Sequence, residues 1–107
     1  MVECHRALDQ LLHRQELTES EVEEKRDLLD RFVQRLELRA LDQQVLDMAS
    51  KPLPTSLATL DAIHLATARI YRREQPEDER SIVLATHDRA LAKAAAALTL
   101  RFDVIGV

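Results

Sequence analysis

The chain has 107 residues, enough for one small domain with a single hydrophobic core. Hydrophobic residues make up 46% and charged residues 32%, with one Gly and no Trp; this composition favours a helix-rich soluble protein over an all-β fold, whose tight turns need Gly. The net charge of −4 excludes a general electrostatic attraction to nucleic acid, so any such binding would need a local basic patch.

An amphipathic helix is predicted over residues 2–13, where apolar side chains recur at the spacing of one helix face. Glu3 lies four residues before Ala7 and eight before Leu11, so it extends this apolar stripe. A carboxylate in a buried stripe is costly unless it is paired or binds a metal. Glu3 is therefore a candidate site residue, and the alternative is a solvated side chain at a frayed terminus.

The next segments are predicted to form a long helix, a short strand and a brief helix. Thr18 and Glu21 have the spacing of a capping box, which begins a helix that ends near Gln34. Residues 36–40 alternate apolar and polar side chains with the period of a strand. Asp42 then has the position of an N-cap for the brief helix that follows.

The largely apolar stretch at residues 60–68 predicts a helix that is apolar on most sides and ends near Arg73. A proline-containing loop precedes it, and either Thr59 or Ser56 is expected to cap it. Asp61 falls in its first turn, where the helix dipole favours a negative charge. Asp61 is therefore either a cap or dipole partner, or a carboxylate held in place for a ligand.

A continuous apolar run over residues 81–85 is typical of a strand buried on both faces of a parallel sheet. The polar residues Thr86 and Asp88 follow it, and Asp88 begins an Ala-rich helix. Residues 102–105 are predicted to form the last short strand. This order of helices and strands predicts an α/β fold with a parallel sheet.

Three carboxylates therefore stand at the ends of buried elements, namely Glu3, Asp61 and Asp88. Ligands of open α/β sheets bind beyond the carboxyl ends of the strands, where Asp88 stands. If the three side chains converge, they repel one another until a cation binds, and oxygen ligands suit Mg²⁺ or Mn²⁺. Such an ion typically acts on phosphate groups.

Each of these residues also has a purely structural interpretation. Asp61 and Asp88 are common helix-capping residues, and Thr86 can be a capping hydroxyl. His64 and His87 stand beside them, and a single histidine near a helix start is more often a hydrogen-bonding residue than a metal ligand.

Taken together, the motifs resemble the PIN-domain ribonucleases, and most closely the VapC-type toxins of type II toxin–antitoxin pairs. The most specific motif is Leu-Asp-Ala-Ile-His-Leu-Ala-Thr-Ala at residues 60–68, and Ala-Thr-His-Asp-Arg-Ala-Leu at residues 85–91 accompanies it. Residues 53–57 and residues 2–8 are also similar to that branch. The resemblance follows the chain in order over nearly its whole length.

The resemblance implies a PIN-like three-layer α/β/α fold with a short parallel sheet, and a metal-dependent endoribonuclease that hydrolyses phosphodiesters in RNA. Carried over by position, Glu3, Asp61 and Asp88 would bind Mg²⁺ or Mn²⁺, and Thr86 would be a supporting hydroxyl in the catalytic set. The expected partners are an RNA substrate, a cognate antitoxin and a second copy in a homodimer.

One departure from the family pattern concerns its N-terminal central strand and the aspartate that ends this strand, which have no counterpart in this sequence. We therefore expect residues 1–107 to be a single, N-terminally truncated PIN-like domain. A start site assigned too late, an inactive remnant, or a strand supplied by another copy or a partner would each explain the difference. We expect weak or no nuclease activity from the chain as written.

Two other functions remain open. The chain could be a non-catalytic PIN remnant that binds an antitoxin or its own copy, or a small α/β domain whose acids are only caps. Basic residues on two helices could contact the phosphates of a substrate, namely Arg69, Arg72, Arg73, Arg89 and Lys93. For Arg69, Arg72 and Arg73 the alternative is a solvated helix end, where the helix dipole favours positive charge.

Cys4 is the only cysteine, so neither an internal disulfide nor a cysteine-based zinc site is possible within the chain. No apolar run is long enough to span a membrane, and the N-terminus has no signal-peptide pattern. We therefore expect a cytoplasmic protein without a membrane partner.

Overall fold

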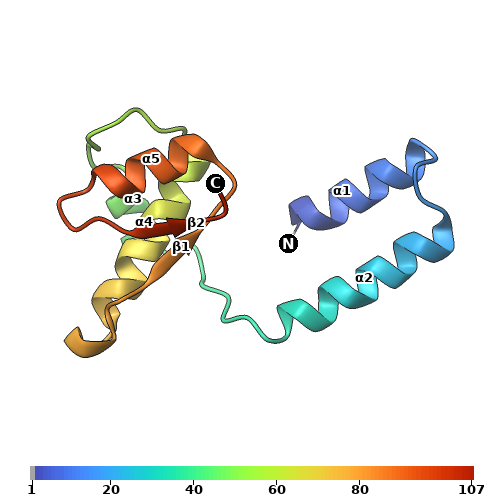
Figure 1. Cartoon of the computed structure of the whole chain (residues 1–107), viewed down its shortest axis with the longest axis horizontal. Coiled ribbons are helices and arrows are strands. Elements are labelled where there is room, and N and C mark those ends of the chain that lie inside the picture. Colours follow the sequence, from blue (N-terminus) through green and yellow to red (C-terminus); the bar gives the residue numbers. More distant parts are fainter. Residues whose placement is uncertain (1) are drawn as a thin grey trace. The chain divides into compact units, whose positions relative to one another are not determined.

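The computed structural model describes residues 2–107, which form two compact units, one ending at Leu38 and the other spanning Arg39–Val107 (Figure 1). Over these residues the chain has five α-helices, a short 3₁₀ helix and a two-stranded parallel sheet. The predicted α/β class is confirmed. The single domain and the three-layer PIN-like arrangement stay predictions. No helix within residues 2–107 has the length and apolar character needed to cross a bilayer.

The first unit is a pair of helices, α1 (Val2–His13) and α2 (Glu19–Val33), which pack against each other (Figure 1). The predicted capping box is confirmed, because the Glu21 backbone N–H donates to Thr18 Oγ1 and the Thr18 N–H donates to Glu21 Oε1, both at 3.2 Å. Val22 is the one buried side chain of α2, and α1 has none. Two helices alone therefore form only a small core.

The predicted strand at residues 36–40 is wrong. This segment is exposed and has no strand pairing in the described part of the chain. Alternating side chains suit a pleated surface, but a strand also needs a neighbour for its backbone hydrogen bonds. Side-chain contacts are made here instead: Arg39 pairs with Glu74 and lies 5.5 Å from the centroid of the Tyr71 ring.

The second unit begins with α3 (Gln43–Ala49), whose predicted N-cap is confirmed: the Val45 N–H donates to Asp42 Oδ1 at 3.0 Å. Helix α3 packs on α4 (Thr59–Glu74), the longest helix of the chain as described. Their contact contains a small buried cluster made of Val45, Ala66 and Ile70.

The start of α4 differs from the prediction that Thr59 or Ser56 caps it. Ala58 is the N-cap residue, and no side chain makes a capping hydrogen bond there. The Ala62 N–H donates to the Ala58 carbonyl oxygen at 2.9 Å. Thr59 is therefore already the first helical residue, one position after the N-cap. Its free N–H groups at this end therefore lack a side-chain cap.

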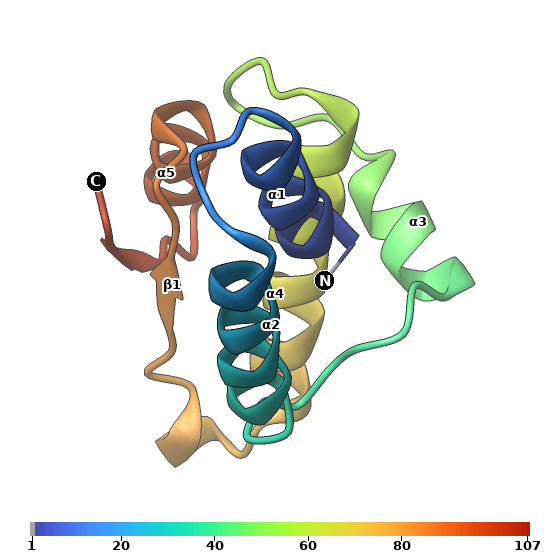
Figure 2. The same cartoon turned by 90° about the vertical axis from the view of Figure 1, so that its right-hand side faces the viewer.

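A strand–helix–strand segment completes the unit. Strand β1 (Val83–Ala85) pairs in parallel with β2 (Asp103–Ile105), and α5 (Arg89–Ala97) connects them (Figures 1 and 2). Leu84 and Val104 are register partners and pack against the main core cluster. That cluster consists of Leu65, Leu91, Ala94, Ala95 and Phe102.

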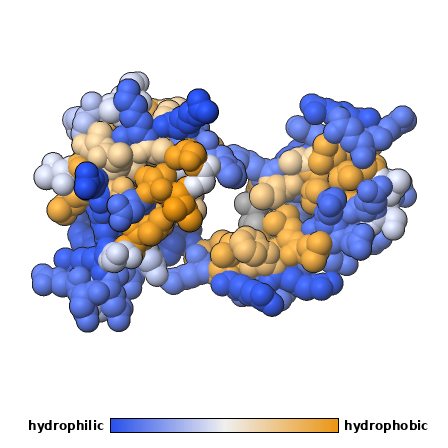
Figure 3. Space-filling model, in the orientation of Figure 1, coloured by the Kyte–Doolittle hydropathy of each residue, from blue (hydrophilic) through white to orange (hydrophobic). Residues whose placement is uncertain are grey.

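The expectation that the 81–85 strand is buried on both faces is wrong. Strand β1 alternates between exposed and half-buried residues, and Val83 is 49% exposed. Within this unit α4 and α5 contribute to the core on one side of the sheet only, so the side chains of the other face stay uncovered. Orange atoms in Figure 3 mark apolar surface in the region of β1, β2 and the C-terminus.

Candidate metal centre

The turn between β1 and α5 holds Asp88 in a defined orientation. Asp88 is the N-cap of α5, and its Oδ1 accepts a hydrogen bond from the Leu91 N–H at 2.9 Å. The Asp88 N–H in turn donates to Thr86 Oγ1 at 3.0 Å. The capping interpretation is confirmed for Asp88, whereas the Thr86 hydroxyl bonds the backbone of the cap residue and does not cap the helix itself. Asp88 Oδ2 has no hydrogen-bond partner within residues 2–107, so this exposed side chain keeps one free oxygen.

The end of β2 supports the same turn from the other side. The Thr86 N–H donates to the Ile105 carbonyl oxygen at 3.0 Å, and His87 Nδ1 lies 2.6 Å from the Gly106 carbonyl oxygen. Because a carbonyl can only accept, Nδ1 must carry the proton in this hydrogen bond. His87 is thus a hydrogen-bonding residue, as its structural interpretation predicted.

Gly106 is a part of this turn that sequence reasoning missed. Its φ is +100°, and a Cβ built on it would lie 2.6 Å from the Thr86 carbonyl oxygen. Any other residue at position 106 is therefore disfavoured, both by the positive φ and by the close contact of its Cβ. The available signal was that Gly106 is the single glycine of the sequence and directly follows the predicted strand of residues 102–105.

Asp61 differs from Asp88 in having no capping bond. It is the third residue of α4, it is half-buried, and its carboxylate has no hydrogen-bond or ion-pair partner in the described residues. The helix dipole still favours its charge. Both of its oxygens are therefore available to a ligand.

The two aspartates of this unit belong to helices that share one core. Asp61 lies one turn before Leu65, and Asp88 lies three residues before Leu91. Leu65 and Leu91 belong to the same buried cluster. Mg²⁺ usually keeps several waters and needs only one or two protein carboxylates, so the donor atoms of Asp61 and Asp88 suit such an ion.

Glu3 belongs to the other unit, on the first turn of α1, where it is exposed. Within residues 2–107, no group of three or more His, Cys, Asp or Glu side chains is arranged to hold a metal ion. His64 is exposed on α4. The three-carboxylate site of Glu3, Asp61 and Asp88, with Thr86 in support, stays a prediction.

Part of the chain is similar to a known ribonuclease. Ribonuclease VapC46 of Mycobacterium tuberculosis is 54% identical over 39 residues, which make up 36% of this chain and 30% of that protein. The match thus spans about a third of the relative's length. No family model matches the chain, and no solved structure matches it.

Proposed function

We propose that this chain is a metal-dependent endoribonuclease of the PIN type and the toxin of a toxin–antitoxin pair. The observation that carries the proposal is its 54% identity over 39 residues to a VapC ribonuclease. The unpartnered carboxylate of Asp61 supports it, since a half-buried acid without a structural role is available for a site.

The proposed site uses Asp61 and Asp88 in different ways. Asp61 would contribute both oxygens, and Asp88 would contribute Oδ2 while its Oδ1 keeps the hydrogen bond from Leu91. Thr86 would act as a positioning residue, because it accepts a hydrogen bond from the Asp88 backbone. Glu3 would be the third acidic ligand. Bound Mg²⁺ or Mn²⁺ would supply an activated water and stabilise the charge on a phosphodiester.

Metal binding tests the site. We expect Mn²⁺ to raise the thermal midpoint of the wild-type chain, because a ligand that binds only the folded state stabilises it, by about 2.7 kcal/mol at a hundred times its Kd. Asp61→Asn should remove this gain. The fluorescence of Tyr71, the single tyrosine, follows the Arg39–Val107 unit during unfolding.

Asp78→Asn is the matched control, since Asp78 is an exposed acid of the 3₁₀ helix Glu77–Glu79 in the same unit. It should keep the full Mn²⁺ effect. An equal loss in Asp61→Asn and Asp78→Asn, or no effect of Mn²⁺ on the wild type, would contradict the proposed site.

RNA cleavage tests the reaction. We expect slow cleavage of RNA by the purified chain with Mg²⁺ and none with EDTA, and Asp61→Asn and Asp88→Asn should each abolish it. Asp88→Asn keeps an oxygen that can cap α5, so the fold should survive. Cleavage that continues in EDTA or in Asp61→Asn would count against a metal-dependent site.

The second candidate function is a non-catalytic interaction module that binds an antitoxin or a second copy. The uncovered face of the sheet favours it: Ile105 is 60% exposed and Val83 is 49% exposed. Sedimentation velocity separates the two candidates. Self-association that Ile105→Lys weakens and Asp61→Asn leaves intact, with no Mn²⁺ effect, would favour the module and a homodimer.

A further inference from the structure

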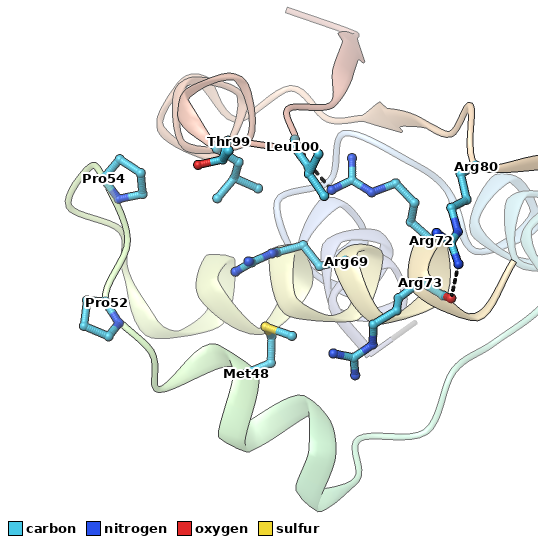
Figure 4. A pocket seen from close by; sticks show the side chains of 10 residues that line it. Met48, Pro52, Pro54, Arg69, Arg72, Arg73, Arg80, Thr99 and Leu100 are labelled. Atoms are coloured by element: carbon cyan, nitrogen blue, oxygen red, sulfur yellow. Dashed lines mark hydrogen bonds between the residues drawn. The ribbon is translucent and has the colours of Figure 1, made fainter. Parts of the chain in front are cut away.

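A cavity of about 550 Å³ in the Arg39–Val107 unit has four arginines in its lining. It lies between α4, the loop after α3 and the chain that leaves α5 (Figure 4). Met48, Pro54 and Leu98 give it apolar walls, and no Asp or Glu lines it. The arginines are Arg69, Arg72, Arg73 and Arg80. This is a local positive site in a chain whose net charge is −4.

Two of these arginines are anchored by neutral groups. Arg72 donates to the carbonyl oxygens of Leu100 at 2.7 Å and Arg101 at 3.2 Å, and its guanidinium lies 3.7 Å from the centroid of the Phe102 ring. Arg80 donates to a main-chain carbonyl of Gln75 at 2.9 Å. These contacts hold the side chains without neutralising their charge.

The guanidinium groups of Arg69 and Arg73 have no hydrogen-bond or ion-pair partner in residues 2–107. The acid at the end of α4, Glu74, pairs with Arg39 instead. Burial and the positive charge of Arg69 lower the pKa of Arg72. An anion in the cavity would relieve this repulsion between like charges.

We propose that this cavity binds a phosphate group. The planar guanidinium fork matches phosphate oxygens with two parallel hydrogen bonds, and Arg69 and Arg73, which stand about one turn apart on α4, each bring such a fork to the lining of the cavity. The apolar walls leave room for the remainder of a nucleotide. The group can come from a small phosphate compound or from a nucleic-acid strand, and the second source would deepen the proposed ribonuclease function, on which it rests.

The site is separate from the proposed metal centre. Arg69 lies eight residues after Asp61 on α4, a distance of roughly 12 Å along the helix axis. Phosphate binding here needs no divalent ion. The site can therefore be measured in EDTA, in which the proposed metal centre cannot function.

The test is a titration of the full chain in EDTA with pyrophosphate and with a ten-nucleotide single-stranded RNA, against sodium chloride at equal ionic strength. We expect pyrophosphate to bind and to raise the thermal midpoint. The double variant Arg69→Gln/Arg73→Gln should weaken binding at least about tenfold, the expected loss for one charged hydrogen bond. The affinity of Arg69→Lys/Arg73→Lys for pyrophosphate should lie between those of the wild type and the glutamine variant, because lysine keeps the positive charge but lacks the planar guanidinium fork.

The control variant Arg31→Gln/Arg35→Gln removes two exposed arginines of the other unit and the same net charge. It should bind like the wild type. If RNA also binds and competes with pyrophosphate, a strand is the source; the slope of log K against log salt should then fall by about 0.7 for each phosphate contact that the arginine variant loses. Pyrophosphate binding without RNA binding indicates a small phosphate compound.

Three results would overturn the proposal: pyrophosphate no more effective than chloride, an equal loss in the control variant, or tighter binding of a glutamate-rich peptide than of either phosphate probe. Asp61→Asn should leave phosphate binding unchanged. Failure of the phosphate site is therefore distinguishable from failure of the proposed metal centre, which Mn²⁺ and RNA cleavage test independently.

Discussion

At the scale of single residues, the candidate aspartates Asp88 and Asp61 differ in their structural roles. Asp88 caps α5 and so has one oxygen committed to the Leu91 N–H. Asp61 stands in the first turn of α4 without a capping bond. Asp88→Ala, which removes the cap, should therefore affect both folding and ligand binding, whereas a substitution of Asp61 should affect ligand binding alone.

Gly106 is the residue whose replacement should disturb the candidate site most directly. We expect Gly106→Ala to lower the free energy of unfolding by about 1–3 kcal/mol, because its φ is +100° and the new Cβ would lie 2.6 Å from the Thr86 carbonyl oxygen. Urea unfolding followed by Tyr71 fluorescence measures the change. Val107→Ala, at a neighbouring exposed residue, should stay within about 0.5 kcal/mol; equal midpoints for the two variants would contradict the role given to Gly106.

At the scale of elements, the sequence predicted helices better than strands. Thr18, Asp42 and Asp88 were each expected at a helix start, and each side chain makes its capping bond there. A cap depends on residues three positions apart, so the sequence carries most of the information. A strand depends on a partner that is distant in sequence, which is why residues 36–40 misled the prediction.

The capping box of α2 gives a test at this scale. Thr18→Ala removes the acceptor for the Glu21 N–H, and we expect a loss of about 1 kcal/mol from the stability of the helix pair. Circular dichroism during thermal unfolding should show the helical signal lost at a lower temperature. Ser20→Ala changes an exposed residue of the same turn whose side chain has no bond there; a loss as large as that of Thr18→Ala would mean that the capping box is not the cause.

At the scale of the whole molecule, the chain forms two compact units joined near residue 38. Residues 34–42 are exposed throughout and contain no regular element. Exposed, irregular segments are the preferred sites of proteolysis. Residues 34–42 are therefore expected to be the first segment that a protease cleaves.

Limited trypsin digestion tests this expectation. The first cut should follow Arg35, which is exposed just after α2, and it should leave the Arg39–Val107 unit largely intact on a gel and by mass spectrometry. Arg69 and Arg72, inside α4, should be cleaved much later because α4 contributes to both buried clusters. A first cut within α4 would contradict the division into two units.

The sequence by itself determined the capped starts of α2, α3 and α5, the α/β class and the identity of the candidate carboxylates, because these follow from local spacing and residue chemistry. Only the tertiary structure decided which groups those carboxylates contact. It left Asp61 without a bond, gave one oxygen of Asp88 to a cap, and brought Gly106 against Thr86. It also assembled four arginines around one cavity. Contacts between residues far apart in the chain depend on packing, which local patterns do not encode.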